Sequence, residues 1–259
     1  MDNGIGITRK VEGKEFYEAN LAIALKGCND EGYEAQFMPA LIDSRINSPK
    51  DARIWQTWFC APSIKATGKT KAGNAVVVYA HVPNYFSNYK NIIKAQKSLR
   101  NGAGSMPREE FQRLLDLEDK KNLFVVDYSA LRNSTSGVIS LADALKHPQT
   151  IPFLGGQARA EAYLEKHSQV FGDKIGNWHY YDDLAEQPFG RVLYVGGSRG
   201  NVLNGGYLGS NGRFVGVKKG SEGAQKNSPT PNQLQRIISE FTAPCNQEEV
   251  ARRIKVLYK

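Results

Sequence analysis

The sequence predicts an α+β protein with short strands, flanking helices and a glycine-rich segment toward its C-terminal end. Of the 259 residues, 41% are hydrophobic and 10% aromatic, which suffices for one large domain or two small ones and rules out general disorder. Short β-branched and aromatic runs alternate with helical runs. The 25 glycines follow no collagen-like period of three. Their concentration near one end is therefore a local feature of a globular chain.

The first part of the chain, residues 1–120, is expected to form a small α/β accessory region. Helical periodicity, stop signals and a proline in the first turn predict helices over residues 15–26, 89–99 and 107–117. Runs of β-branched and aromatic residues between prolines and turn residues predict strands over residues 35–46, 53–61 and 75–82. These strands would form a small antiparallel sheet.

The second part, residues 121–218, is expected to form the main domain, and residues 219–259 a linker with C-terminal helices broken at Pro244. A short apolar run predicts a buried strand over 123–128, and short strands are predicted over 192–195 and 213–217. Helices are predicted over 140–146, with Ser140 as its cap, and over 156–167, with Gly172 ending the region.

Charge and segment composition limit the function classes. The net charge of +8 permits nucleic acid or another anionic partner, although no block of five like charges occurs. No run of 18 apolar residues and no signal-peptide pattern is present, so we expect a soluble protein without Sec export or a membrane span, cytoplasmic or part of a viral particle. The odd number of cysteines predicts buried thiols rather than a disulfide framework.

Motifs for cofactors and catalysis are weak. Gly68-Lys69-Thr70 resembles the end of a phosphate-binding loop, but a turn into a strand follows instead of a helix, so we expect no nucleotide cofactor. The four histidines lack metal-ligand spacing, so no metal site is expected. Asp182-Asp183 beside His179 leaves open a cation site or an enzyme at this cluster. No catalytic residue is assigned.

The glycine-rich segment is the most informative part of the sequence. Nine of the 27 residues from 190 to 216 are glycine, and the others include Tyr, Ser and Asn. These residue types are typical of binding loops, since tyrosine supplies rigid contact area and small polar residues adapt their hydrogen bonds. The alternative interpretation is a flexible hairpin that binds nothing. Strand-like residues on both sides favour a binding loop with fixed ends.

Four short motifs then follow one another in order, Gly176-Asn177-Trp178, Arg191-Val192-Leu193, Gly196-Gly197-Ser198 and Gly212-Arg213-Phe214-Val215. Together they resemble the C-terminal part of the C-type-lectin-like fold in formylglycine-generating enzymes and in the variable proteins of diversity-generating retroelements. The chain departs from that pattern at Arg199, where the family usually has tryptophan. The resemblance covers residues 176–217, and no sulfatase-activating cysteine pair is evident near it.

The resemblance implies a C-type-lectin-like fold, a viral or prokaryotic source, and a non-enzymatic receptor-type protein that presents a diversified surface to a protein or other macromolecular ligand. In that family, errors at template adenines do not produce Lys, Glu, Gln, Met or Trp, and residues 198–211 contain none of these. Trp178 is expected in the core, and the side chains between the flanking strands are expected to point outward. The candidate ligand-binding residues are Ser198, Arg199, Asn201, Asn204, Tyr207, Ser210 and Asn211, with Tyr180 and Tyr181 as aromatic neighbours.

An alternative function comes from the basic residues outside this segment. Lysine and arginine outnumber acidic residues in 1–124 and again in 218–259. A nucleic-acid-binding or nucleic-acid-processing protein would use such surfaces for phosphate contacts, and its binding would weaken steeply with added salt. The ligand, the oligomeric state and the role of residues 1–120 are not indicated by the sequence.

Overall fold

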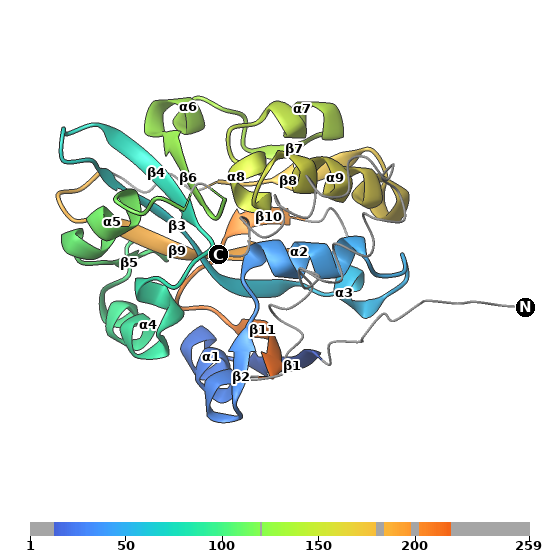
Figure 1. Ribbon diagram of the computed structural model, residues 1–259, viewed down its shortest axis with the longest axis horizontal. Helices are drawn as coiled ribbons and strands as arrows, with labels where there is room; N and C mark the ends of the chain where they lie inside the picture. The colour runs from blue at the N-terminus through green and yellow to red at the C-terminus, as the bar shows by residue number, and fades with distance from the viewer. Residues whose placement is uncertain (1–12, 120, 180–183, 198–201, 219–259) are drawn as a thin grey trace, which may run out of the picture. The chain divides into compact units, whose positions relative to one another are not determined.

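The computed structural model describes residues 13–119, 121–179, 184–197 and 202–218 (Figure 1). Gly13–Lys219 form one compact unit, which contains all of the described residues. The helices predicted within residues 219–259 lie outside the described part of the chain.

The strands of the described unit belong to two sheets. They are β1 (Gly13–Glu18), β2 (Tyr33–Ala35), β3 (Phe59–Lys69), β4 (Ala75–Ala80), β5 (Gly104–Ser105), β6 (Leu123–Asp127), β7 (Gly137–Ser140), β8 (Lys174–Asn177), β9 (Phe189–Val195), β10 (Val202–Gly205) and β11 (Gly212–Lys218). The small sheet has the order β1-β11-β2 and the large sheet the order β6-β4-β3-β9-β10-β8-β7, with β5 also paired to β9. All described pairs are antiparallel except β10 with β8.

The helices connect and cover these strands. They are α1 (Leu21–Asp30), α2 (Met38–Ile46), α3 (Arg53–Gln56), α4 (Tyr89–Ala95), α5 (Arg108–Leu115), α6 (Tyr128–Arg132), α7 (Leu141–Lys146), α8 (Thr150–Leu154) and α9 (Gln157–Phe171), with 3-10 turns at Tyr85–Ser87 and Gln96–Ser98. The helices predicted over 89–99, 107–117, 140–146 and 156–167 are confirmed, including the Ser140 cap.

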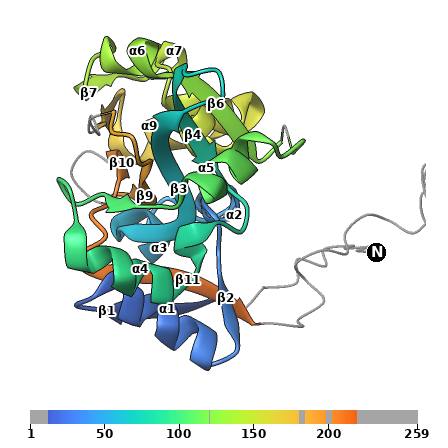
Figure 2. The ribbon, with the colours of Figure 1, turned by 90° about the vertical axis from the view of Figure 1, so that its left-hand side faces the viewer.

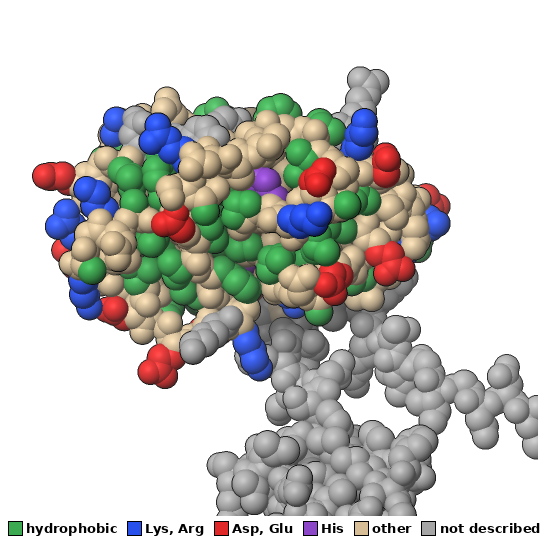
Figure 3. Space-filling view, turned by 90° about the horizontal axis from the view of Figure 1, so that it is seen from above, with side chains coloured by type: hydrophobic (Ala, Val, Ile, Leu, Met, Phe, Trp, Pro, Cys, Tyr) green, Lys and Arg blue, Asp and Glu red, His purple; other side chains and the backbone are tan. Residues whose placement is uncertain are grey.

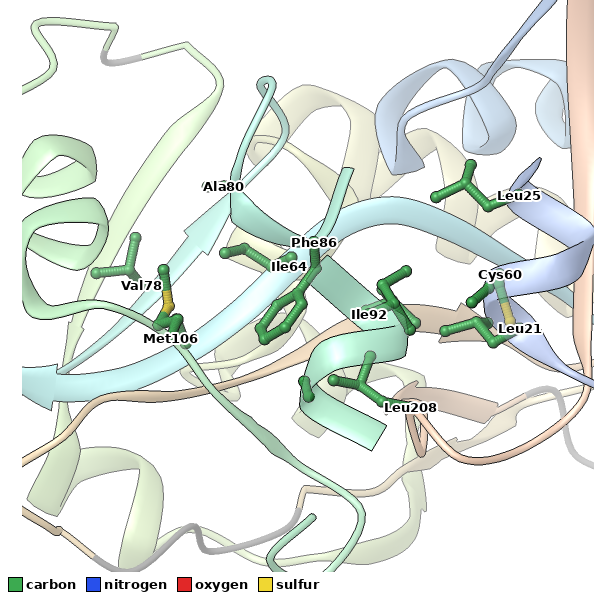
Figure 4. Close-up of a cluster of buried hydrophobic side chains, with 14 of the residues drawn as sticks. Leu21, Leu25, Cys60, Ile64, Val78, Ala80, Phe86, Ile92, Met106 and Leu208 are labelled. Carbon is green, nitrogen blue, oxygen red and sulfur yellow. The ribbon is translucent and has the colours of Figure 1, made fainter. Parts of the chain in front are cut away.

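A hydrophobic cluster lies on each face of the large sheet, because successive side chains of a strand point to opposite faces. In β4, Val76 and Val78 belong to one cluster and Val77 and Tyr79 to the other. The first cluster also receives side chains from α1, α4 and α5, and the second from α2, α8 and α9. Figure 4 shows the first cluster, and Figure 2 shows the helices on the two sides of β3 and β4.

The two ends of the described unit meet in the small sheet, where β1 pairs with β11 from Gly13↔Val217 to Glu18↔Gly212. The helix predicted over 15–26 was therefore wrong in its first half. Residues 15–18 are strand, because pairing with β11 outweighs their local helical pattern. The helix begins only at Leu21, after Asn20, whose side chain accepts hydrogen bonds from the next turn.

Two predicted strands were wrong in part. Residues 38–46 form α2, which starts with Pro39 near its first position and buries Met38, Leu41, Ile42 and Arg45 at helical spacing. Residues 53–56 form α3, and β3 begins at Phe59 and continues past Pro62 to Lys69. The register against β9 shifts between Ala61 and Ile64, and a bulge at this point accommodates the proline.

The strand predicted over 123–128 is present as β6, but it is not buried. It pairs only with β4 and ends the large sheet, so one of its sides has no strand partner among the described residues. The side chain of Val125 is 49% exposed. A short apolar run thus occurs here in an edge strand.

The boundary expected at residue 120 falls inside the large sheet. β3 and β4 precede it, while β6 and β9 follow it and pair with them. The residues on both sides of position 120 therefore share the same two hydrophobic clusters.

Candidate ligand-binding site

Residues 202–211, which form β10 and its connection to β11, belong to the glycine-rich segment, and their backbone is fixed at three places. Gly206 N donates to Val192 O at 2.7 Å, and Leu208 N donates to Gly102 O at 2.9 Å. The Ser210 carbonyl accepts from Leu21 N at 2.9 Å. The loop is therefore tied to β9, to the turn at 101–102 and to the start of α1.

Two leucines anchor this connection in the core. Leu203 is fully buried in the cluster beneath α2, α8 and α9, and Leu208 is fully buried in the opposite cluster, where Figure 4 shows it near Ile92 of α4. The expectation that all side chains between the flanking strands point outward was wrong for these two. Burial of one leucine on each face of the sheet explains how a glycine-rich connection keeps one conformation.

The remaining predicted side chains of this connection lie around one pocket. The pocket has a volume of about 260 Å³ and is lined by Trp58, Cys60, Tyr194, Asn204, Gly205, Gly206, Tyr207, Ser210 and Asn211. All four described candidates of the glycine-rich segment are thus brought together. Ser198, Arg199, Asn201, Tyr180 and Tyr181 lie outside the described residues.

The ring of Tyr207 packs against the turn at residues 101–102, where only a glycine leaves room for it. Asn101 and Gly102 both have positive φ, and a side chain at Gly102 would collide with the Tyr207 ring, since an added Cβ would lie 1.6 Å from Cδ1. The guanidinium of Arg191 lies over the ring, 5.4 Å from its centroid. Arg191 is buried and donates to Asn101 O at 2.6 Å. The Tyr207 ring therefore packs against Gly102 and Arg191, while 44% of the residue stays exposed.

The other wall of the pocket comes from Trp58 just before β3, from β3 itself and from β9, and sequence reasoning missed it. Trp58 lies 5.7 Å from Tyr194 and 6.1 Å from Tyr17, measured between ring centroids. The guanidinium of Arg213 lies 5.0 Å from the Trp58 ring and 4.6 Å from the Tyr17 ring. No short motif marks Trp58, Tyr194 or Tyr17, although Arg213 belongs to the last of the four motifs. The pairing of β3 with β9 and of β1 with β11 brings these residues together.

An ion-pair network supports this aromatic wall. Glu15 accepts from Arg213 Nη1 at 2.7 Å and from Arg53 Nη2 at 3.2 Å. Asn211 Nδ2 donates to the Tyr17 hydroxyl at 3.3 Å. The wall is therefore tied to the first and last strands of the unit, and one pocket residue is tied to the wall.

The described residues lining the pocket include no lysine, arginine or acid. Cys60 is 4% exposed, and burial raises the pKa of its thiol to about 12, so the group is neutral at physiological pH. Burial, with the nearby Cys60, raises the pKa of the Tyr194 hydroxyl. Asn204 Oδ1 is enclosed and accepts no hydrogen bond from the described chain. The pocket thus presents aromatic rings and uncharged polar groups.

Trp178 was expected in the core, and this was wrong, because 42% of the residue is exposed. Asn177, the preceding residue of the same motif, is fully buried. Asn177 accepts from Gln149 Nε2 at 2.6 Å and donates to Thr150 Oγ1 at 2.9 Å. The amide of Asn177 therefore joins β8 to α8, and the indole of Trp178 is left at the surface.

The histidines, the Asp182-Asp183 pair and the Gly68-Lys69-Thr70 motif form no second candidate site among the described residues. His147 and His179 are neighbours, with ring centroids 5.4 Å apart, and burial lowers the pKa of both. Asp182 and Asp183 lie outside the described residues, and no group of three or more possible metal ligands is found among the described ones. After Thr70 the chain turns into β4, as predicted.

The surface charge of the described residues bears on the nucleic-acid-binding alternative. On the face shown in Figure 3, basic and acidic side chains are interspersed around the rim, and hydrophobic side chains occupy much of the middle. A continuous basic patch is absent from the described part of this face. Within the described residues, no helix has the length and apolar character needed to cross a bilayer.

Comparisons with known proteins give one informative match. No protein-family model and no curated protein matches the chain. A solved structure, described as the accommodation of massive sequence variation in Nanoarchaeota by the C-type lectin fold, is 53% identical, with a TM-score of 0.76 over 81% of this chain and 99% of that chain. The predicted α+β class and C-type-lectin-like fold are thereby confirmed. At this identity and coverage, the chain belongs to the family of C-type-lectin-fold proteins that the Nanoarchaeota structure represents.

Proposed function

We propose that this chain is a non-enzymatic variable protein of a diversity-generating retroelement, and that the pocket beside β10 binds a protein or other macromolecular ligand. One observation carries the proposal. Asn204, Tyr207, Ser210 and Asn211 line a single pocket, while the leucines at 203 and 208 between and beside them are buried. Positions that contact a ligand are thus separated from positions that hold the fold.

The family supports diversification of this surface. The similar Nanoarchaeota structure is described in terms of massive sequence variation accommodated by the same fold. The residues from 198 to 211 are also those that adenine-directed errors can produce. Ser198, Arg199 and Asn201, with Tyr180 and Tyr181 as neighbours, belong to the same proposed surface.

The chemistry of the pocket favours binding over catalysis and over phosphate recognition. Its cysteine is a protonated thiol, which is a poor nucleophile. Its described lining carries no cation to neutralise a phosphate. Nucleic-acid binding would therefore have to use another surface, and it would be recognised by a steep loss of affinity with salt.

Sequencing the encoding locus across closely related isolates tests the proposal. We expect substitutions at codons 204, 207, 210 and 211, constancy at codons 203 and 208, and a nearby template copy with a reverse transcriptase gene. Uniform variation along the gene, with no template copy, would reject the proposal.

A further inference from the structure

The pocket has two walls of different origin. Asn204, Tyr207, Ser210 and Asn211 form the wall that we propose to be variable. Trp58, Cys60 and Tyr194 form the other. Trp58 directly precedes β3, Cys60 lies in β3, and Tyr194 lies in β9, before the stretch 198–211 that we propose to be variable. Because Trp58 packs against Tyr17 and Arg213 of the strands that close the unit, this second wall is part of the fold. We therefore expect it to be the same in every variant of the loop.

The size of the pocket indicates what fits in it. Its volume of about 260 Å³ lies below the roughly 300–1,000 Å³ that small-molecule sites usually have. A space of this size accommodates one side chain of a larger partner. Aromatic side chains are the usual anchors in such interface pockets, because they bury much area at little entropic cost.

Charge excludes a basic anchor. The rings of Trp58 and Tyr207 already have guanidinium groups against them, from Arg213 at 5.0 Å and Arg191 at 5.4 Å. Arg213 is paired with Glu15, but each ring already has a cation against it, and a lysine or arginine of the partner would find no carboxylate among the described lining residues. The aromatic wall therefore suits an uncharged ring.

The side-chain oxygen of Asn204 favours a ligand that carries a hydrogen-bond donor. Asn204 Oδ1 accepts no hydrogen bond from the described residues, although it is enclosed. An enclosed acceptor without a partner destabilises the chain, so a donor brought by the ligand is favoured. Asn204 lines the pocket, and the last torsion of a carboxamide has broad energy wells, so the inference requires this side chain to turn its acceptor toward a bound ligand. A phenol or an indole supplies such a donor, and a phenyl ring does not.

We propose that the pocket receives an uncharged aromatic side chain with a hydrogen-bond donor, a tyrosine or a tryptophan, from a protein partner. The fixed wall of Trp58, Cys60 and Tyr194 packs against the ring in every variant, and the four variable positions select the groups around it. The inference rests on the proposed function, since it takes this pocket as the binding site, and it adds the chemistry of the ligand.

The test uses side-chain mimics with the full chain. p-Cresol, 3-methylindole, toluene, n-butylammonium and a methyl glucoside are titrated separately, and the backbone amide shifts of Gly205 and Gly206 report on the pocket. We expect p-cresol and 3-methylindole to bind with dissociation constants on the order of millimolar. Toluene should bind about five-fold more weakly, the equivalent of one hydrogen bond of about 1 kcal/mol. n-Butylammonium and the glucoside should show no saturable shift.

Variants assign these effects to atoms. Asn204→Ala should bring the affinity for p-cresol down to that for toluene and leave toluene binding unchanged. Trp58→Leu should weaken all aromatic probes, with its fold checked by thermal unfolding. Val138→Ala, at an exposed position of β7, is the matched control and should change nothing.

Three results would overturn the inference: equal affinity for toluene and p-cresol, tighter binding of n-butylammonium or the glucoside than of p-cresol, or full p-cresol affinity in Asn204→Ala. These results are independent of locus sequencing. If the probes bind as expected and the codons are constant, the proposed diversification fails while the pocket chemistry stands. If the codons vary and the probes do not bind as expected, the proposed pocket chemistry fails while the diversification stands.

Discussion

Replacement of Leu208 by alanine tests whether the glycine-rich connection is anchored in the core. Leu208 is fully buried and belongs to the cluster with Phe86, Ile92 and Ala95 (Figure 4). Its Cδ1 packs so closely over Gly104 that an added Cβ there would lie 2.6 Å from it. Removal of three carbon atoms from this position leaves a cavity between α4 and β5.

The size of the effect follows from burial. A fully buried Leu→Ala substitution costs about 2–5 kcal/mol, since it combines lost transfer free energy with an unfilled cavity. For a unit of this length, each kcal/mol lowers the melting temperature by roughly 2–4 °C. A loss of about 3 kcal/mol therefore predicts a decrease of roughly 6–12 °C.

The assay is urea unfolding of the full chain, followed by tryptophan fluorescence, with Asn211→Ala as the matched control. Asn211 lies three residues away on the exposed side, and its side chain makes one hydrogen bond, to the Tyr17 hydroxyl. We expect the control to lie within about 0.5 kcal/mol of the parent chain. Equal free energies of unfolding for the two variants would refute the separation of anchoring and exposed positions.

Three further predictions concern the same unit. Gly212→Ala should lower the free energy of unfolding by roughly 1–3 kcal/mol, since the new Cβ would lie 2.6 Å from Leu21 Cα, and an unchanged urea midpoint would contradict this. Burial lowers the pKa of His81 to about 4, so between pH 6.5 and 4 the unfolded chain binds more protons than the folded one. As the pH falls over this range, His81 should lower the free energy of unfolding by up to roughly 3 kcal/mol. Burial also lowers the pKa values of His167 and His179 to about 4, so His81→Gln should reduce the slope measured by urea titration at several pH values without abolishing it; an equally steep slope in the variant would count against this account. At pH 7.5, iodoacetamide should label Cys60 only in urea, because burial raises the pKa of this thiol to about 12, and mass-spectrometric detection of the adduct in the native chain would contradict it.

Local patterns predicted the elements whose signals are themselves local. The helix over 140–146 was identified by its serine cap, and α9 by its alanine, glutamate and leucine content and the glycine after it. The motifs behind the family resemblance also correspond to structure, because Asn177 and Arg191 are buried and hydrogen-bonded in β8 and β9. These residues maintain the fold around the loop.

The failures have a common cause in tertiary contacts. Residues 15–18 form a strand only because β11 returns to pair with them, 194 or more residues later in the chain. Residues 38–46 were predicted as a strand on their apolar content, although Met38, Leu41, Ile42 and Arg45 have helical spacing. Trp178 was assigned to the core from residue type alone, which says nothing about the direction of its side chain.

The candidate site was predictable only on its loop side. The composition of the glycine-rich segment identified Asn204, Tyr207, Ser210 and Asn211, which line the pocket. Trp58, Cys60 and Tyr194 carry no motif, and the register of β3 against β9 decides that they face the loop. Leu208 and the pair Val202-Leu203 are the apolar aliphatic residues among the small polar ones of 198–211, and that contrast was the available signal for the burial of the two leucines.

Two matched display libraries test the central claim, which is that positions 204, 207, 210 and 211 are free to vary because the fold depends on their neighbours instead. One library randomises positions 204, 207, 210 and 211, and the other randomises 203, 205, 208 and 212. Protease resistance of the displayed chain is measured clone by clone. The account predicts that most clones of the first library stay resistant and that most clones of the second are cleaved. Equal resistant fractions in the two libraries would contradict it.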